Sequence, residues 1–125
     1  MSEQTLAQRR AKHALGRINS LEGTSYGHYR SYVSALPASI LTNGLGQAVA
    51  TVRAGSQPGY EQLYEHLSSW LCDGDAESPY PEGDLLKNIT VHNEEHYLHA
   101  QAEAMAYLEW LKKFATTFLE KGKES

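Results

Sequence analysis

The sequence is poor in the residues that cross-link small proteins and in those that build β-strands. It has one cysteine, Cys72, so no disulfide can form within the chain, and a lone thiol is typical of proteins in a reducing cytosol. Valine and isoleucine together supply seven residues, whereas leucine and alanine supply 29. No sustained apolar run has a period of two. Because strands need β-branched residues far more than helices do, the composition predicts an all-α protein.

Long apolar runs are also missing. None reaches the length of a membrane-spanning helix, and the basic N-terminal residues are not followed by the apolar stretch of a secretory signal. We therefore expect a cytoplasmic protein without a membrane partner. The 125 residues fit one compact helical domain, 1–125, which buries roughly two thirds of its unfolded surface without disulfides or metals. That length excludes most multi-domain enzymes.

The charge is unevenly distributed along the chain. The formal net charge of −4 argues against a nucleic-acid partner, because phosphate binding depends on basic surface. Residues 1–53, however, hold six basic and two acidic side chains, whereas residues 54–125 hold five basic and thirteen acidic ones. The average therefore conceals two zones of opposite sign.

Apolar spacing, glycines and prolines divide the chain into helices. The expected helices cover 3–22, 25–36 with Ser25 as a cap, 37–54 with an interruption at 43–46, 58–72, a short turn at 85–89, and 93–121. Pro37 is expected to break the second helix or to open a new one. Residues 73–84 are acidic and rich in proline and glycine, which predicts an exposed, flexible loop. The result is a single compact bundle of about five to six helices with a long C-terminal helix.

The last expected helix carries a long apolar stripe. Its members are Tyr97, Ala100, Ala104, Tyr107, Leu111, Phe114 and Phe118. Such a stripe needs a helical partner.

The first expected helix has an apolar face and a basic face. The apolar positions are Ala7, Ala11, Ala14, Ile18 and Leu21. At 100° per residue, the opposite face carries Arg9, Arg10, Lys12, His13 and Arg17, with no acidic residue among them. A solvated face usually mixes both signs, so this one indicates contact with phosphates or with an acidic partner, the alternative being plain solvation. The residues that follow, Tyr26, His28, Tyr29, Arg30 and Tyr32, could stack on bases or belong to the core.

One segment matches a zinc motif. Residues His92-Asn93-Glu94-Glu95-His96 fit the H-x-x-E-H pattern, in which two histidines one turn apart bind zinc and the glutamate activates water. His99 and Glu103 continue the same face and could add ligands. Only three positions of the pattern are fixed, and 29 residues are too few to build a substrate cleft after it. We favour the alternative, an ordinary solvated first turn of a helix, and predict no metal site.

The acidic loop resembles the start of a calcium loop. Asp73-Gly74-Asp75-Ala76-Glu77 supplies oxygen ligands, and Asp84 stands at the twelfth position. Ser78, however, occupies the position that needs a glycine, and Pro79 and Pro81 stiffen the remainder. We favour a loop without a bound ion.

No other group of residues suits catalysis. Cys72 and His66 could suggest a thiol nucleophile, but nothing supplies the remaining groups, and a small apolar filler is the better interpretation. The segment Asn43-Gly44-Leu45-Gly46-Gln47 is too poor in glycine for a phosphate loop and follows no strand. It suits a helix cap or a close helix contact, or a backbone surface for a partner. We predict no enzyme activity and no cofactor.

Four segments, taken together and in their order along the chain, are similar to those of a known protein family. They are Gln8-Arg9-Arg10-Ala11, Tyr32-Val33-Ser34-Ala35-Leu36-Pro37-Ala38-Ser39-Ile40-Leu41, Asn43-Gly44-Leu45-Gly46-Gln47-Ala48 and Glu109-Trp110-Leu111-Lys112-Lys113-Phe114-Ala115. Together they resemble the small all-helical subunit of Cmr-type (type III-B) CRISPR effector complexes. The resemblance covers nearly the whole chain and is weakest at 73–84.

The resemblance implies a non-catalytic role in antiviral defence. Subunits of this family look like helical blocks, several copies of which lie along the guide RNA–target RNA duplex and against the backbone subunits. Target cleavage belongs to the backbone subunits, and the nuclease and cyclic-oligonucleotide chemistry to the large subunit. No active-site residues therefore transfer to this chain.

The charge pattern suggests how such a block works. RNA along a protein filament is held mainly by phosphate contacts, which need a basic face. The residues expected to face RNA or an adjoining subunit are Arg9, Arg10, Lys12, Arg17 and Arg30, with Arg53, Lys112 and Lys113 as second-rank candidates. The acidic half could pair with neighbouring subunits or with another copy of the chain.

Two other functions stay open at this stage. A generic helical adaptor would bind protein through its tyrosine- and leucine-rich faces without RNA. A small zinc-dependent hydrolase would use His92, Glu95 and His96.

Overall fold

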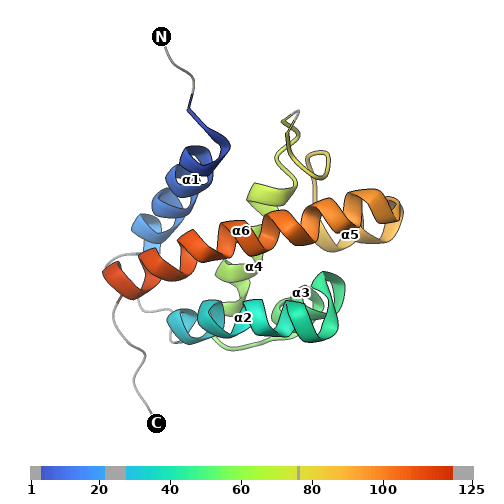
Figure 1. Cartoon of the computed structure of the whole chain (residues 1–125). Coiled ribbons are helices and arrows are strands. Elements are labelled where there is room, and N and C mark those ends of the chain that lie inside the picture. The colour runs from blue at the N-terminus through green and yellow to red at the C-terminus, as the bar shows by residue number, and fades with distance from the viewer. Residues whose placement is uncertain (1–3, 22–27, 76, 120–125) are drawn as a thin grey trace.

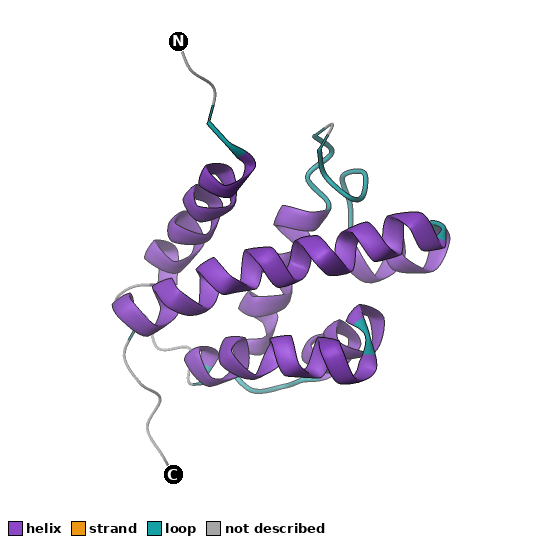
Figure 2. Ribbon diagram, in the orientation of Figure 1, coloured by secondary structure: helices purple, strands orange, loops and turns teal. Residues whose placement is uncertain are grey.

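The protein folds into packed α-helices. The computed structural model describes residues 4–21, 28–75 and 77–119, and these contain six helices and no strand (Figures 1 and 2). The helices are α1 (Leu6–Leu21), α2 (Tyr29–Asn43), α3 (Leu45–Ala54), α4 (Tyr60–Leu71), α5 (Leu85–Val91) and α6 (Glu94–Phe118). The all-α class and the long C-terminal helix are confirmed.

Helix α6 is the centre of the bundle. It crosses the molecule between α1 and α2 and also packs on α4 (Figure 1). Its buried apolar residues are Ala100, Ala104, Tyr107, Leu108, Leu111 and Ala115. The small side chains among them let neighbouring helices approach closely, and each fully buried leucine contributes about 1.5–3 kcal/mol to stability. The predicted stripe thus has its helical partners, although Phe118, 43% exposed, lies beyond the core.

Helix α2 runs through Pro37 without interruption, so the predicted break there is wrong. Proline removes one backbone hydrogen bond from a helix interior. On α2 the buried residues Val33, Leu36 and Ile40 keep helical spacing on both sides of Pro37. Their burial holds both halves of the helix on one face and outweighs the missing bond. The predicted cap Ser25 lies outside the described residues.

The predicted interruption at 43–46 is confirmed, and it is a turn of a single residue. Gly44, with φ of +84°, separates α2 from α3. Side chains of α6 satisfy the first free N–H groups of α3: Leu45 N–H donates to Gln101 Oε1 at 2.9 Å, and Gly46 N–H donates to Tyr97 Oη at 2.8 Å. A Cβ at Gly44 would lie 3.0 Å from that hydroxyl, so the turn needs glycine both for its dihedral angle and for space.

Aromatic packing fixes the connection from α3 to α4. Helix α4 begins at Tyr60 rather than at the predicted Pro58. Just before it, Gly59 N–H donates to Gln62 Oε1 at 3.0 Å. The Tyr60 ring stacks on Tyr32 of α2, with centroids 3.8 Å apart and planes 6° from parallel. Its position leaves no room for a side chain at Gly55, where a Cβ would overlap the ring.

The acidic segment 73–84 is anchored to the end of α4. Ser78 Oγ donates to the Leu71 carbonyl at 2.8 Å, and Tyr80 N–H donates to the same carbonyl. The Tyr80 side chain is buried. Asp84 then caps α5 by accepting from Lys87 N–H at 3.2 Å.

Candidate nucleic-acid interface

A groove runs along the outer side of α1. Its lining residues are Gln4, Arg9, Lys12, His13, Gly16, Arg17 and Ser20. Gly16 keeps part of it open, since nothing lies within 4 Å of the position where a Cβ would stand. Within the described part of the chain, Lys12 and Arg17 make no ion pair. Among the described residues, the lining of the groove therefore combines the cations Arg9, Lys12 and Arg17 with no carboxylate.

Arg10 does not face this groove. Its guanidinium forms two hydrogen bonds with Glu103 of α6, at 2.5 Å from Nε and 2.9 Å from Nη2, and Trp70 Nε1 donates to the same carboxylate at 2.8 Å. Burial by itself would raise the pKa of Glu103, but the hydrogen bonds from Arg10 and Trp70 hold it below its usual range. The pair with Glu103 in turn raises the pKa of Arg10.

His13 is also turned toward the bundle. Its Nδ1 lies 2.7 Å from Tyr107 Oη and its Nε2 lies 3.3 Å from Ser69 Oγ. Burial, helped by the positive charge of Arg17, lowers the pKa of His13 to about 4. The prediction that all five basic residues lie opposite the buried face is therefore wrong for Arg10 and His13. Because α4 and α6 both pack against α1, the buried side of this helix is displaced from the predicted apolar stripe, whose first member, Ala7, is exposed.

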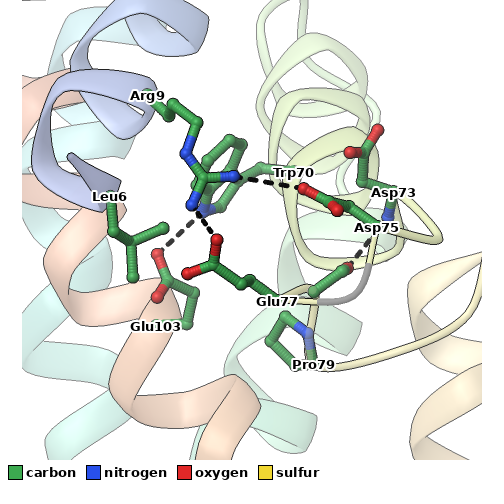
Figure 3. A pocket seen from close by; sticks show the side chains of 9 residues that line it. Leu6, Arg9, Trp70, Asp73, Asp75, Glu77, Pro79 and Glu103 are labelled. Carbon is green, nitrogen blue, oxygen red and sulfur yellow. Dashed lines mark hydrogen bonds and ion pairs between the residues drawn. The ribbon is translucent and has the colours of Figure 1, made fainter. Parts of the chain in front are cut away.

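Arg9 lies between the groove and the acidic segment. Its Nη1 is 3.2 Å from Asp75 Oδ2, and its Nη2 contacts Glu77 Oε1 (Figure 3). The guanidinium, Leu6, Trp70 and Pro79 line a small pocket under these carboxylates. Residues far apart in the sequence thus bring negative charge to a helix face that carries none of its own.

The other candidate cations lie at separate places. Arg30 lies near the start of α2, and the exposed Lys112 and Lys113 lie in the second half of α6. In Figure 1 the start of α2 and the end of α6 lie on the same side of the view as the end of α1. Arg53 instead lies over the Tyr64 ring, 5.7 Å from its centroid. It shares a hollow with the acidic residues Glu61, Glu65 and Asp84.

Tyr29 and Tyr32, two of the three tyrosines considered for base stacking, pack within the bundle. Tyr29 is buried, with its hydroxyl 2.7 Å from His66 Nδ1, and burial raises its pKa. Burial lowers the pKa of His66 to about 3, with added repulsion from Arg17 and His13. One face of Tyr32 is covered by Tyr60. Tyr26 lies outside the described residues.

The zinc and calcium motifs do not gather their residues into a site. His92 follows α5, and Asn93 is the cap of α6, accepting from His96 N–H at 3.1 Å. His96 Nδ1 lies 2.9 Å from the Pro79 carbonyl, and Glu103 is held by Arg10. Within 4–21, 28–75 and 77–119, no three His, Cys, Asp or Glu side chains are placed to share a metal ion.

The thiol considered as a nucleophile is a packing residue in this structure. Cys72 is buried, and burial raises the pKa of its thiol, which disfavours the nucleophilic thiolate.

The sequence interpretation missed the partners that decide which cations stay exposed. These are Glu103, Trp70 and Tyr107 around Arg10 and His13, and Asp75 and Glu77 around Arg9. Glu103 carried a signal, because it lies next to Ala104 within the apolar stripe of α6. A buried carboxylate needs a cation.

Comparison with known proteins identifies the family. The sequence model of the family described as "CRISPR-associated protein (Cas_Cmr5)" matches residues 6–118, from the first residue of α1 to the last of α6. The chain belongs to this family. It is therefore a small subunit of a Cmr-type CRISPR complex, and the resemblance seen in the sequence is confirmed.

A solved structure supports the same fold. It is an X-ray crystal structure of a CRISPR-associated Cmr5 family protein from Thermus thermophilus, which is 24% identical to this chain. The TM-score is 0.79, and the match covers 94% of this chain and 100% of that one. The helical arrangement of this Cas_Cmr5 protein is thus shared with a family member from Thermus. No described helix of the present chain is long and apolar enough to cross a membrane.

Proposed function

We propose that this Cas_Cmr5 chain is a non-catalytic subunit of a type III-B ribonucleoprotein, stacked in several copies along the guide RNA–target RNA duplex in the cytoplasm. The observation that carries the proposal is the basic groove along α1. Phosphate contacts hold RNA without reading its sequence, and a helix with several cations on one side supplies them. Membership of a Cmr-type complex supports the presence of such an RNA near the chain.

The structure ranks the cations for this role. Lys12 and Arg17 come first, because they line the groove and make no ion pair within the described residues. Arg30, Lys112 and Lys113 lie outside the groove lining and come after them, and Arg53 remains a second-rank candidate. Arg10 is committed to Glu103 and acts in folding. Contacts with backbone subunits fall to the acidic half of the chain, which complements basic surfaces.

The test replaces cations of the groove and measures RNA binding. Chains carrying Lys12→Ala, alone or with Arg17→Ala, are assembled into the Cmr complex, and target-RNA affinity is measured over a salt series. Each lost phosphate contact should flatten the log–log salt slope by about 0.9 and weaken binding several-fold. Lys87→Ala removes an equally exposed lysine from α5 and serves as the control. Equal salt slopes for wild type and the double variant would refute an RNA-facing groove.

A second function, protein docking without RNA, is favoured by one observation. Leu41, Val91 and Leu98 are between 56% and 75% exposed, and apolar side chains of this size contribute contact area when a protein partner covers them. Purification with ribonuclease treatment separates the two functions, because an adaptor would keep its protein partners after the RNA is digested. No feature of the described residues favours a zinc hydrolase built on His92, Glu95 and His96.

A further inference from the structure

The ion pair between Arg9 and the acidic segment differs from every other ion pair found among the described residues. One guanidinium meets two carboxylates, those of Asp75 and Glu77, through its two terminal nitrogens. Arginine binds a phosphate in a similar way, because two N–H groups of its guanidinium donate to two phosphate oxygens. The acidic segment therefore presents to Arg9 what an RNA strand would present.

Exposure makes this pair exchangeable. The side chains of Arg9, Asp75 and Glu77 are 31%, 49% and 56% exposed. Exposed ion pairs contribute little to stability, so a competing anion can replace one at small cost. In the Arg10–Glu103 pair, by contrast, the carboxylate is only 6% exposed, and breaking that pair would leave a buried charge.

The carboxylates stay close to Arg9 because their segment is anchored on both sides. Ser78 binds the Leu71 carbonyl, and Asp73 N–H donates to Ser78 Oγ at 3.1 Å. Tethered groups compete as if present at high concentration. Exchange then needs only rotation of the Arg9 side chain toward the groove that it already lines, and the segment itself can stay in place.

We propose that Asp75 and Glu77 are intramolecular competitors of RNA phosphates for Arg9, so that this arginine joins the RNA-binding groove only when RNA displaces them. The inference rests on the proposed function and adds a regulation to it. Arg9 adds little net affinity while the carboxylates are present, because binding RNA breaks one pair to form another. The acidic segment thereby limits how tightly the subunit holds any polyanion.

A double-mutant cycle tests the competition. Binding of the full chain to a labelled mixed-sequence RNA duplex is measured by fluorescence anisotropy across a salt series. Four proteins form the cycle: wild type, Arg9→Ala, Asp75→Asn with Glu77→Gln, and the triple variant. Glu94→Gln with Glu95→Gln removes two exposed carboxylates from the first turn of α6 and controls for net charge.

The expected result is strongly non-additive. Neutralising Asp75 and Glu77 should tighten RNA binding about 3- to 10-fold and steepen the salt slope by about 0.9, the value for one added phosphate contact. Arg9→Ala should change affinity less than about 2-fold in wild type and should abolish the gain in the neutralised background. Thermal unfolding should be nearly unchanged by the neutral substitutions, because the pairs are exposed.

Two outcomes would overturn the competition while leaving the proposed function intact. One is an equal effect of Arg9→Ala in both backgrounds, which would mean simple through-space repulsion. The other is an equal gain from the Glu94/Glu95 control. Loss of the proposed function itself has a separate signature, namely that Lys12→Ala with Arg17→Ala leaves RNA affinity and salt slope unchanged.

Discussion

Single side chains at the junction of α1, α4 and α6 decide both folding and surface charge. Trp70 stacks on Tyr107, with centroids 5.5 Å apart, and its N–H reaches Glu103. Arg10 and His13 enter the same cluster from α1. Two of the five polar residues on the basic face are therefore used to hold the helix in place.

The two buried histidines predict acid sensitivity. Their pKa values fall from about 6.5 in the unfolded chain to about 4 for His13 and about 3 for His66. Between pH 7 and pH 4 the unfolded chain binds more protons than the folded chain, so the free energy of unfolding decreases as the pH falls, by about 3 kcal/mol for His66 and by less for the partly exposed His13. Despite burial, the hydrogen bonds from Arg10 and Trp70 hold the pKa of Glu103 below its usual range, so its contribution is lost as the pH falls through the folded pKa.

Thermal unfolding at several pH values checks this prediction. Replacing His13 and His66 by glutamine should flatten the dependence between pH 7 and pH 4, whatever the change in stability at neutral pH. A slope that survives the double substitution would assign the acid sensitivity to other groups.

Helical spacing was sufficient to place Arg9, Lys12 and Arg17 on a common side of α1, because that depends only on the period of the helix. It could not place Arg10 and His13, whose environment is set by residues 93 and 94 positions further along the chain. The basic face was also predicted to be free of acid. The tertiary contact of Arg9 with Asp75 shows why sequence-local charge is a poor guide to surface potential.

At the scale of elements, turn residues were more predictable than helix lengths. Gly44 interrupts a helical pattern, and the structure has its turn there because glycine tolerates a positive φ. Pro37 gave an equally strong local signal, yet burial of the residues around it overrode the missing hydrogen bond. Phe118 continues the apolar stripe of α6 but is exposed, and the helical period alone cannot predict that difference.

Two glycines make opposite predictions for alanine substitution. Gly16→Ala meets nothing within 4 Å and should raise the free energy of unfolding by about 0.5–1 kcal/mol, since alanine favours the helix. Gly55→Ala forces a Cβ against the Tyr60 ring and should lower it by about 1–3 kcal/mol. Urea unfolding of the two variants measures both changes. Equal changes in the free energy of unfolding would mean that the space around each glycine does not determine the effect of the added Cβ.

At the scale of the whole molecule, the two charge zones of the sequence are not two separate regions in space. The basic first helix and the acidic segment touch through Arg9, and the buried pair of Arg10 and Glu103 again joins the two halves. Opposite charges from the two zones thus neutralise each other in part within the fold. The charges left to bind partners are those of Lys12 and Arg17 in the groove and those of acidic side chains that lie elsewhere on the surface.

Removal of α1 should unfold the protein. Deleting residues 1–21 exposes the surface that covered Ile18 and Leu21 and leaves Glu103 without its cation. Burial of two large apolar side chains contributes about 3–6 kcal/mol and a broken buried pair costs about 3–5 kcal/mol, against a total stability of about 5–15 kcal/mol.

Tryptophan fluorescence checks this outcome, because Trp70 lies at the lost interface and its emission should shift to longer wavelength. Gly16→Ala, which keeps α1 whole and meets nothing within 4 Å, is the control and should leave the emission unchanged. A cooperative transition in the α1-deleted chain at the wild-type midpoint would contradict the prediction.

The pairing of α1 with α6 also has a consequence during synthesis. Tyr107, the partner of His13, is synthesised 94 residues later. At about 5–20 residues per second, the ribosome adds these residues in on the order of 5 to 20 s. Until then the α1 segment lacks α6, and Arg10 lacks Glu103, whereas Asp75 and Glu77, the partners of Arg9, are made earlier. The nascent chain is most basic when residues 1–53 have been made, with six basic and two acidic side chains, and it is then most attractive to stray polyanions such as ribosomal RNA.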